Sequence, residues 1–404
     1  MRQTPTGWMT WPRAAGITPP VERKKERYEP VVRAASSDLD DPVAAIESVF
    51  RELDPPSLAG LLLFCSSRYD LAAVADAVTA RSEGITVIGC TSSGEISPSG
   101  LREGTITAIG FPAEYFTMSA IRFDGLDHFD ASHAHQAIRA LVANAAEHSR
   151  HLGPHPSRAA LFLVDGLSHR EEMLTVTVQD ALGEIPLIGG SSGDGLDFRE
   201  TFVFHEGVFR RNAALIAILA STRPMHAFRS QHYKPGNVKM VITGADPVDR
   251  IVHEVNAEPA AKEYARLVGV PVDELGPDVF ATRPPMVRVG GEYYCRSIQS
   301  ANPDGSLTFY CAIDEGVVMT LGEAHDVMHE LEALFDELDA TVGGIDRVIG
   351  FDCVLNSVEL RQRQLRRNVS DLFAAHHVAG FNTYGEQFHA LHVNQSFSGL
   401  AIGR

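Results

Sequence analysis

The chain reads Ile85-Thr86-Val87-Ile88-Gly89-Cys90-Thr91-Ser92-Ser93-Gly94-Glu95 at the first of three related places. An apolar run leads into a glycine there, and small hydroxyl residues, a second glycine and an acid follow. The same order, Gly-x-x-[Ser/Thr]-x-Gly-Glu, returns in His377-Val378-Ala379-Gly380-Phe381-Asn382-Thr383-Tyr384-Gly385-Glu386. A copy one residue shorter reads Ile185-Pro186-Leu187-Ile188-Gly189-Gly190-Ser191-Ser192-Gly193-Asp194. Glycine after an apolar run favours a tight turn at a strand end, so we interpret the copies as one repeated unit.

Each copy is preceded by an apolar strand-like run and by a segment with helical spacing. The apolar runs are Leu61 to Phe64, Leu161 to Val164 and Val348 to Phe351. In the segments between these runs and the glycines, apolar residues recur three and four positions apart, which is typical of a helix face. Strand, helix and strand with so long a crossover make a βαβ unit with parallel strands. The sequence therefore predicts a mixed α/β fold of repeated βαβ-containing units, with glycine turns at strand ends, in two halves.

The spacing within the copies makes a sharper prediction. Cys65 to Gly89 and Asp165 to Gly189 are both 24 positions apart, so copies one and two should superpose as whole units. Asp352 to Gly380 is 28 positions, and four added residues make about one helical turn. The third copy should therefore carry an extra turn of helix.

Composition and charge exclude several classes of partner. The 404 residues are 44% hydrophobic and 22% charged, as in ordinary globular proteins. A net charge of −17 argues against nucleic acid and against anionic membranes, because both need a basic face. Five cysteines without a Cys-x-x-Cys pair fit reduced thiols. No apolar run approaches the length of a membrane span. We therefore expect a cytoplasmic protein with no membrane or nucleic-acid partner.

Four segments carry a resemblance to a known family. Val87 to Glu95, Asp165-Gly166-Leu167-Ser168, Gly189 to Asp194 and Gly380 to Gly399 resemble the FIST family of bacterial sensory domains. Residues 35–225 resemble its N-terminal part, with two internal repeats, and residues 226–404 its C-terminal part. Residues 1–34, rich in Pro, Arg and Thr, are expected to form a disordered tail.

The resemblance also implies a function. Within the family, the chain is most similar to stand-alone nitric-oxide sensors that bind haem and control a partner histidine kinase. It therefore implies a non-enzymatic sensor of a gas or small molecule, which signals to a histidine kinase or a diguanylate cyclase. The oligomeric state stays open, a homo-oligomer included.

The residues at the predicted strand ends are candidates for ligand binding. In open α/β sheets, ligands bind beyond the carboxyl ends of the strands. Acids there would repel a phosphate and suit an amino group, so a small metabolite such as an amino acid is an alternative ligand. We expect Glu95, Asp165, Asp194 and Glu386 to face polar cavities, and Glu386→Ala to change ligand binding more than thermal stability. The full set of candidates is Cys90, Ser92, Ser93, Gly94, Glu95, Asp165, Gly189, Ser191, Ser192, Asp194, Asn382, Tyr384, Gly385, Glu386 and Asn394.

Two histidines are candidate ligands of a haem iron. His232 lies near the boundary of the two halves, and His392 follows the third glycine segment. Domain junctions are common ligand sites, which favours His232 over His392. The sequence has no Cys-x-x-Cys-His, so the haem that the resemblance implies would be b-type. For each histidine, a core residue bonded to the backbone is about as good an interpretation.

A hydrolase is the remaining alternative, but the residues that follow its sequence motif do not fit a hydrolase. Gly189-Gly190-Ser191-Ser192-Gly193 satisfies G-x-S-x-G, but a nucleophile elbow must run directly into a helix. Asp194-Gly195 and a strand-like segment follow instead. The glycine segments also lack the lysine of a P-loop. We therefore predict no catalytic residue.

Overall fold

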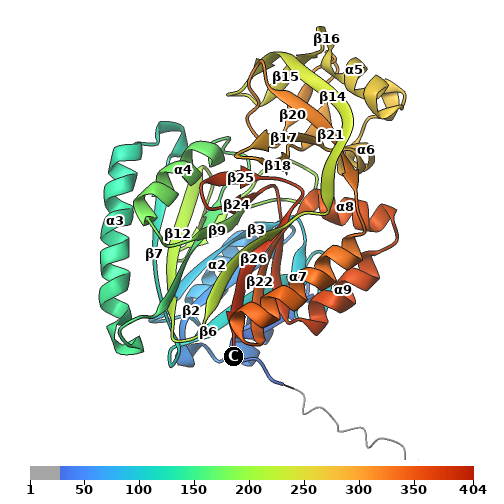
Figure 1. The fold of residues 1–404 in the computed structure, drawn as a ribbon. Helices are drawn as coiled ribbons and strands as arrows, with labels where there is room; N and C mark the ends of the chain where they lie inside the picture. The colour runs from blue at the N-terminus through green and yellow to red at the C-terminus, as the bar shows by residue number, and fades with distance from the viewer. Residues whose placement is uncertain (1–27) are drawn as a thin grey trace, which may run out of the picture.

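The computed structural model describes residues 28–404, and three related units form its body (Figure 1). Each unit runs strand, helix, strand, helix, strand, hairpin, strand. The first unit consists of β1 (Arg33–Ser37), α1 (Pro42–Leu53), β2 (Leu58–Ser66), α2 (Leu71–Thr79), β3 (Thr86–Ser92), β4 (Glu95–Ser97), β5 (Gly100–Arg102) and β6 (Ile106–Pro112). The second consists of β7 (Phe116–Asp124), α3 (Ala131–His148), β8 (Ser157–Val164), α4 (Glu171–Leu182), β9 (Leu187–Ser191), β10 (Val203–His205), β11 (Val208–Arg210) and β12 (Ala213–Ser221).

The third unit follows the same order but has two helices in place of one and carries an insertion. It consists of β13 (Met225–Ser230), α7 (Val327–Val342), β22 (Ile345–Cys353), α8 (Val354–Gln362), α9 (Arg366–Ala375), β23 (Val378–Thr383), β24 (Glu386–Phe388), β25 (Leu391–Val393) and β26 (Phe397–Gly403). The insertion between β13 and α7 is a separate lobe, at the top of Figure 1. Its elements are β14 (Tyr233–Asp246), β15 (Ile251–Val255), β16 (Glu258–Pro259), α5 (Ala260–Val268), α6 (Pro277–Thr282), β17 (Pro285–Val289), β18 (Glu292–Cys295), β19 (Ile298–Ala301), β20 (Leu307–Phe309) and β21 (Val318–Ala324).

The units exchange their hairpins in a ring. Each builds a six-stranded sheet around a parallel pair, β2/β3, β8/β9 or β22/β23, which confirms the predicted βαβ units. The sheet orders are β1-β6-β2-β3-β10-β11, β7-β12-β8-β9-β24-β25 and β13-β26-β22-β23-β4-β5. Thus the second unit lends its hairpin to the first, the third to the second, and the first to the third. The N-terminal and C-terminal halves are therefore interlocked rather than side by side.

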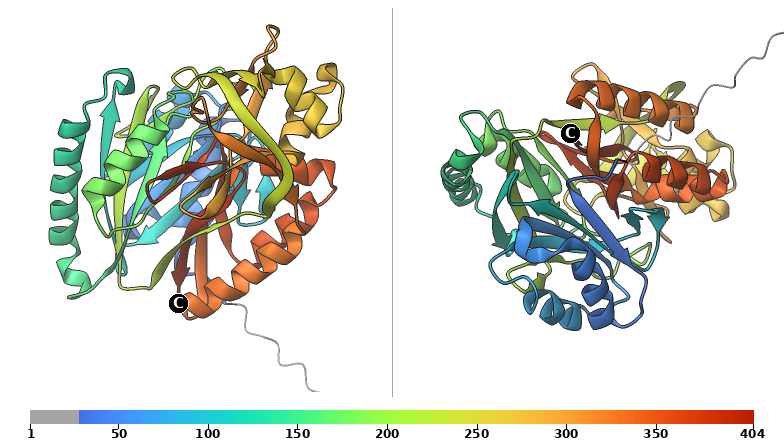
Figure 2. Two further views of the ribbon diagram at one scale, coloured as in Figure 1. Left: turned by 45° about the horizontal axis from the view of Figure 1, so that its top comes forward. Right: turned by 90° about the horizontal axis from the view of Figure 1, so that it is seen from below.

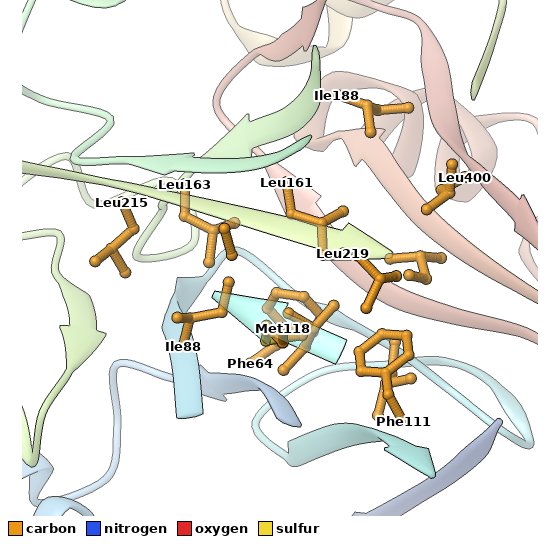
Figure 3. Close-up of a cluster of buried hydrophobic side chains, with 14 of the residues drawn as sticks. Phe64, Ile88, Phe111, Met118, Leu161, Leu163, Ile188, Leu215, Leu219 and Leu400 are labelled. Carbon is orange, nitrogen blue, oxygen red and sulfur yellow. The ribbon is translucent and has the colours of Figure 1, made fainter. Parts of the chain in front are cut away.

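The three sheets surround one apolar core, and helices cover their outer faces. Along β2, Leu62 and Phe64 point into the shared core, whereas Leu61 and Leu63 pack under α1 and α2. Both faces of these strands are buried, which explains their continuous apolar runs. Figure 3 shows side chains from all three units meeting in this core, Phe64, Leu161 and Leu400 among them. Seen from below in Figure 2, the helices of the units lie on different sides of the body.

The lobe is joined to the body by a stalk of two antiparallel strands. β14 leaves the body at Tyr233 and β21 returns at Ala324, and these two residues pair with each other. Just below them, the His325 N–H donates to the His232 carbonyl at 2.8 Å. The lobe has its own apolar cluster, in which Met240, Tyr264 and Phe280 are buried.

The glycines that define the repeat lie inside strands, so their interpretation as turns is wrong. Gly89, Gly189 and Gly380 are residues of β3, β9 and β23, and none of them has a positive φ. A Cβ on each would lie 1.8–2.2 Å from a carbonyl oxygen of the neighbouring parallel strand. Close approach of two backbones therefore requires glycine here.

We expect Gly189→Ala to destabilise the protein by about 1–3 kcal/mol, because the added methyl would meet the Phe162 carbonyl at 1.8 Å. Urea unfolding followed by circular dichroism measures the change. Gly244→Ala is the matched control, since Gly244 also lies in a strand and a Cβ there would meet its nearest atom, in Glu254, at an ordinary contact distance of 3.4 Å. Equal stability of the two variants would contradict the close-approach explanation.

Copies one and two have equal spacing in the sequence, but the pairing of their parallel strands differs by one residue. Gly89 pairs with Leu63 but Gly189 pairs with Phe162, so Cys65 corresponds to Val164 and Ser66 to Asp165. In the third copy the four added residues do not extend one helix. Instead α8 begins directly after β22, and a break at Gln364, with φ 59°, separates it from α9.

Three further features bear on the predictions made from sequence. The tail ends earlier than residue 34, because Tyr28 and the N–H groups of Val31 and Val32 bond to Asp346. Residues 1–27 of the predicted tail lie outside the described residues. All five cysteines are free and buried. Within residues 28–404, no helix combines the length and the apolar character needed to cross a bilayer.

Candidate functional site

The three glycine segments meet at one end of the body. The Ser93 N–H donates to the Asn382 carbonyl at 3.0 Å, and the Gly193 N–H donates to the Thr91 carbonyl at 3.1 Å. The Ser191 N–H donates to the Gly385 carbonyl at 2.8 Å. The structure therefore brings the candidates chosen from sequence together, but their hydrogen bonds are mostly to one another. The ring of exchanged hairpins closes at this place.

Glu95 and Glu386 occupy equivalent places and bond to protein groups on every side. Glu95 accepts from the Ser92 hydroxyl at 2.5 Å and from the Thr105 N–H and hydroxyl at 2.9 and 2.8 Å. Glu386 accepts from the Thr383 hydroxyl and from the Ser396 N–H and hydroxyl, the last at 2.6 Å. Both side chains are fully buried. Each clamps its glycine segment to the strand that follows the hairpin.

Burial also perturbs the titration of these acids. Desolvation raises the pKa of Glu95 to about 7 and that of Glu386 to about 8, although their hydrogen bonds act in the opposite direction. Both carboxyls therefore hold their protons more tightly in the folded chain than in the unfolded chain.

We expect a stability component that is present below pH 4.5 and is lost as the pH rises to about 7, because only unfolded Glu95 then releases its proton. This component should be about 3 kcal/mol, so Glu95→Gln, which cannot titrate, should lose about 3 kcal/mol less than wild type, while Glu386 and Asp352 contribute to the pH dependence of both proteins. Urea unfolding at pH 5 and pH 8 measures it. Glu83→Gln, an exposed change, should keep the wild-type dependence. A parallel dependence in Glu95→Gln and wild type would refute this assignment.

The second unit uses its acids differently. Val203, not Asp194, occupies the place of Glu95 and Glu386, since it pairs with Cys90 as Glu386 pairs with Gly190. Asp194 instead accepts from the N–H groups of residues 198–200 and from the Tyr384 hydroxyl. Asp165 accepts from the Thr201 hydroxyl and the Asn212 N–H. These carboxylates organise the long loop between β9 and β10.

The remaining candidates are also held by internal contacts. Cys90 lies in the central core, and the Ser192 hydroxyl donates to the Val164 carbonyl at 3.2 Å. The Ser191 hydroxyl accepts from Gln387 at 2.9 Å, and no helix follows it, so the nucleophile-elbow context is missing. Asn394 is fully buried and bonds to Ser297 and Tyr384. Ligand contact by any of these residues stays a prediction.

The two candidate haem ligands do not offer a haem site. His232 is 6% exposed, and its Nε2 lies 2.8 Å from a Glu359 carboxylate oxygen. The cavity beside it has a volume of about 30 Å³, whereas cofactor pockets measure several hundred. His392 is 4% exposed, with Nδ1 3.1 Å from Gln387 Nε2 and Nε2 3.4 Å from the Tyr310 carbonyl. In this conformation neither residue fits a haem group.

The cavity beside His232 is the better candidate for a ligand site. It lies between the third sheet, its three helices and the foot of the stalk. Its polar lining is Ser230, Gln231, His232, Glu330, Asp352, Asn356 and Glu359, and its apolar lining is Val327, Leu331, Leu360, Val369, Phe373 and Phe397. Because α8 starts immediately after β22, Asp352 at the strand end lies directly below Asn356 and Glu359. The latter two are three residues apart and share a helix face.

The sequence analysis used Asp352 to measure the third copy and identified His232 as a junction residue, but it missed Asn356 and Glu359 as site residues. Every residue of Val354–Leu360 is buried, so this helix has no amphipathic stripe. In the sequence, the signal that could have identified them is a polar residue within a short helical segment that is otherwise mostly apolar.

Comparisons with known proteins match the chain to two family models. Residues 60–258 match the model described as the FIST N domain, and residues 260–389 match the FIST C domain. The border between them falls at residue 259, inside the inserted lobe. No curated protein matches the chain.

Proposed function

This chain belongs to the FIST family of sensory domains, and from that membership we propose that it binds a small ligand and reports to a separate signalling protein in the cytoplasm. FIST domains form sensory rather than catalytic families, and these domains bind small ligands in signal transduction. The partner we propose is a histidine kinase or a diguanylate cyclase.

The position of the cavity carries this proposal. Its lining takes Ser230, Gln231 and His232 from the segment that leads into β14, and Val327, Glu330 and Leu331 from α7, which follows β21. A ligand in the cavity would therefore contact both connections between the body and the lobe. Such contacts can shift the lobe between two arrangements, provided that the ligand prefers one of them.

A thermal-shift screen of small metabolites tests the ligand part of the proposal. Val369→Phe serves as the comparison, because its ring would fill the cavity from α9. A ligand of the site should raise the Tm of wild type and leave the Tm of Val369→Phe unchanged. Autophosphorylation of candidate histidine kinases should then respond to the protein and change again with the ligand. Ligands that stabilise both proteins equally would place binding elsewhere and refute this site.

Haem-based nitric-oxide sensing is the narrower function that the resemblance implies, and the residues around His232 and His392 do not favour it. His232 could reach an iron only if its bond to Glu359 opened and the cavity widened. We expect no Soret band that depends on His232 or His392 after mixing the protein with haem. Absorption spectra of wild type, His232→Ala and His392→Ala decide the matter, since a band lost in either variant would restore the haem proposal.

A further inference from the structure

The cavity at the end of β22 holds an acceptor with no partner. Asn356 is 7% exposed, and its Nδ2 donates to Asp352 Oδ1 at 2.8 Å and to the Ser396 carbonyl at 3.1 Å. Its Oδ1 is buried and has no hydrogen-bond partner among residues 28–404. A buried acceptor left unpaired costs free energy, so it marks a place where a donor belongs.

The two buried carboxylates of the cavity, Glu359 and Asp352, differ in whether a positively charged side chain of the protein lies beside them. Glu359 lies 2.8 Å from His232 Nε2 and 2.9 Å from Arg363 Nε, so a guanidinium of the protein already faces it. In the described part of the chain the donors to the Asp352 carboxylate are the side-chain amides of Asn356 and Asn382, and Asp352 is 4% exposed. Burial raises the pKa of Asp352 to about 7, as expected for a carboxyl that lacks a positive partner.

The opposite wall of the cavity is apolar. Leu331 comes from α7, Leu360 from α8, Val369 and Phe373 from α9, and Phe397 from β26. A hydrated inorganic cation would gain nothing from these side chains, whereas a short hydrocarbon chain would be buried against them. The cavity, about 30 Å³, is larger than the roughly 10–15 Å³ that one water requires.

We infer that this cavity binds the ammonium group of a small primary amine, with Asp352 as its counter-ion, Asn356 Oδ1 as a hydrogen-bond acceptor and the apolar wall around its carbon chain. An ammonium supplies the donor that Asn356 lacks and the charge that Asp352 lacks. An anion would meet the uncompensated carboxylate, and a neutral ligand would leave it uncompensated. The inference rests on the proposed ligand-sensing function and names the class of its ligand.

The test is a thermal-shift titration with methylammonium chloride, whose two heavy atoms suit a cavity of about 30 Å³, with KCl and sodium acetate at equal ionic strength as controls. Wild type should show a saturable rise in Tm of about 3 °C or more with the amine alone. Asp352→Asn should weaken the response about tenfold or more, since it removes the counter-ion. Asp371→Asn, a change of a 76% exposed carboxyl on α9, should leave it intact. Should Asp352→Asn not fold, Val369→Phe blocks the cavity with Asp352 unchanged.

The outcomes separate the two proposals. Equal shifts with KCl and the amine, no shift with the amine, or an amine response that survives in both Asp352→Asn and Val369→Phe would overturn the ammonium inference. A neutral or anionic metabolite that stabilises wild type but not Val369→Phe would also overturn it, while the ligand-sensor function would stand.

Discussion

Replacing Arg250 with alanine should destabilise the folded protein by about 3–5 kcal/mol, because it would leave a buried glutamate charged and unpaired. The Arg250 side chain is 3% exposed, and its Nη2 lies 2.5 Å from Glu171, which is 1% exposed. The same nitrogen lies 2.9 Å from Glu172, and Nη1 donates to the Tyr310 carbonyl at 2.5 Å. Arg250 belongs to the lobe and the two acids begin α4, so this ion pair fixes the lobe to the second unit.

Urea unfolding followed by circular dichroism measures the loss. Arg150→Ala is the matched control, since Arg150 pairs with Glu147 on the surface and the two side chains are 74% and 61% exposed. An exposed pair contributes about 0–1 kcal/mol, so this variant should stay close to wild type. Arg250→Lys should recover only part of the stability, because one ammonium cannot reproduce the fork that reaches three partners. If Arg250→Ala were as stable as Arg150→Ala, the ion pair would not hold the lobe.

Local patterns in the sequence predicted the repeated units well. The apolar runs before each glycine became β2, β8 and β22, and each pairs in parallel with the strand that ends its crossover. The segments with helical spacing between these runs and the glycines contain α2, α4, and the pair α8 and α9. These features depend on residue spacing within some thirty positions, and such spacing is visible in the chain itself.

The exchange of hairpins could not be predicted, because it pairs residues far apart in the sequence. Glu95 pairs with Phe381, and nothing local to either residue identifies the other. The same limit applies to the cavity, where His232 contacts Glu359 of α8, although the two residues are 127 positions apart in the sequence. Glycine was assigned to turns because positive φ is its best-known use, whereas here close approach of strands requires it.

Glu386→Ala should lower the free energy of unfolding by about 3 kcal/mol or more, which is the reverse of the sequence-based expectation that ligand binding would change most. The truncation would leave the Ser396 N–H and the hydroxyls of Thr383 and Ser396 without their acceptor in a fully buried place. Each buried group left unpaired costs about 1–3 kcal/mol. Urea unfolding at pH 7, with the m-value checked for constancy, measures the change.

Glu386→Gln is the matched control, because it keeps the shape of the side chain and one carbonyl oxygen. With its pKa raised to about 8 by burial, Glu386 is largely protonated at pH 7, and a neutral amide is then its closest replacement. Glu386→Gln should therefore lose about 1 kcal/mol or less at pH 7. If both variants were destabilised alike, the negative charge rather than the hydrogen bonds would hold the segment. If Glu386→Ala stayed as stable as wild type while ligand binding was lost, Glu386 would belong to a ligand site and not to the clamp that closes the ring of hairpins.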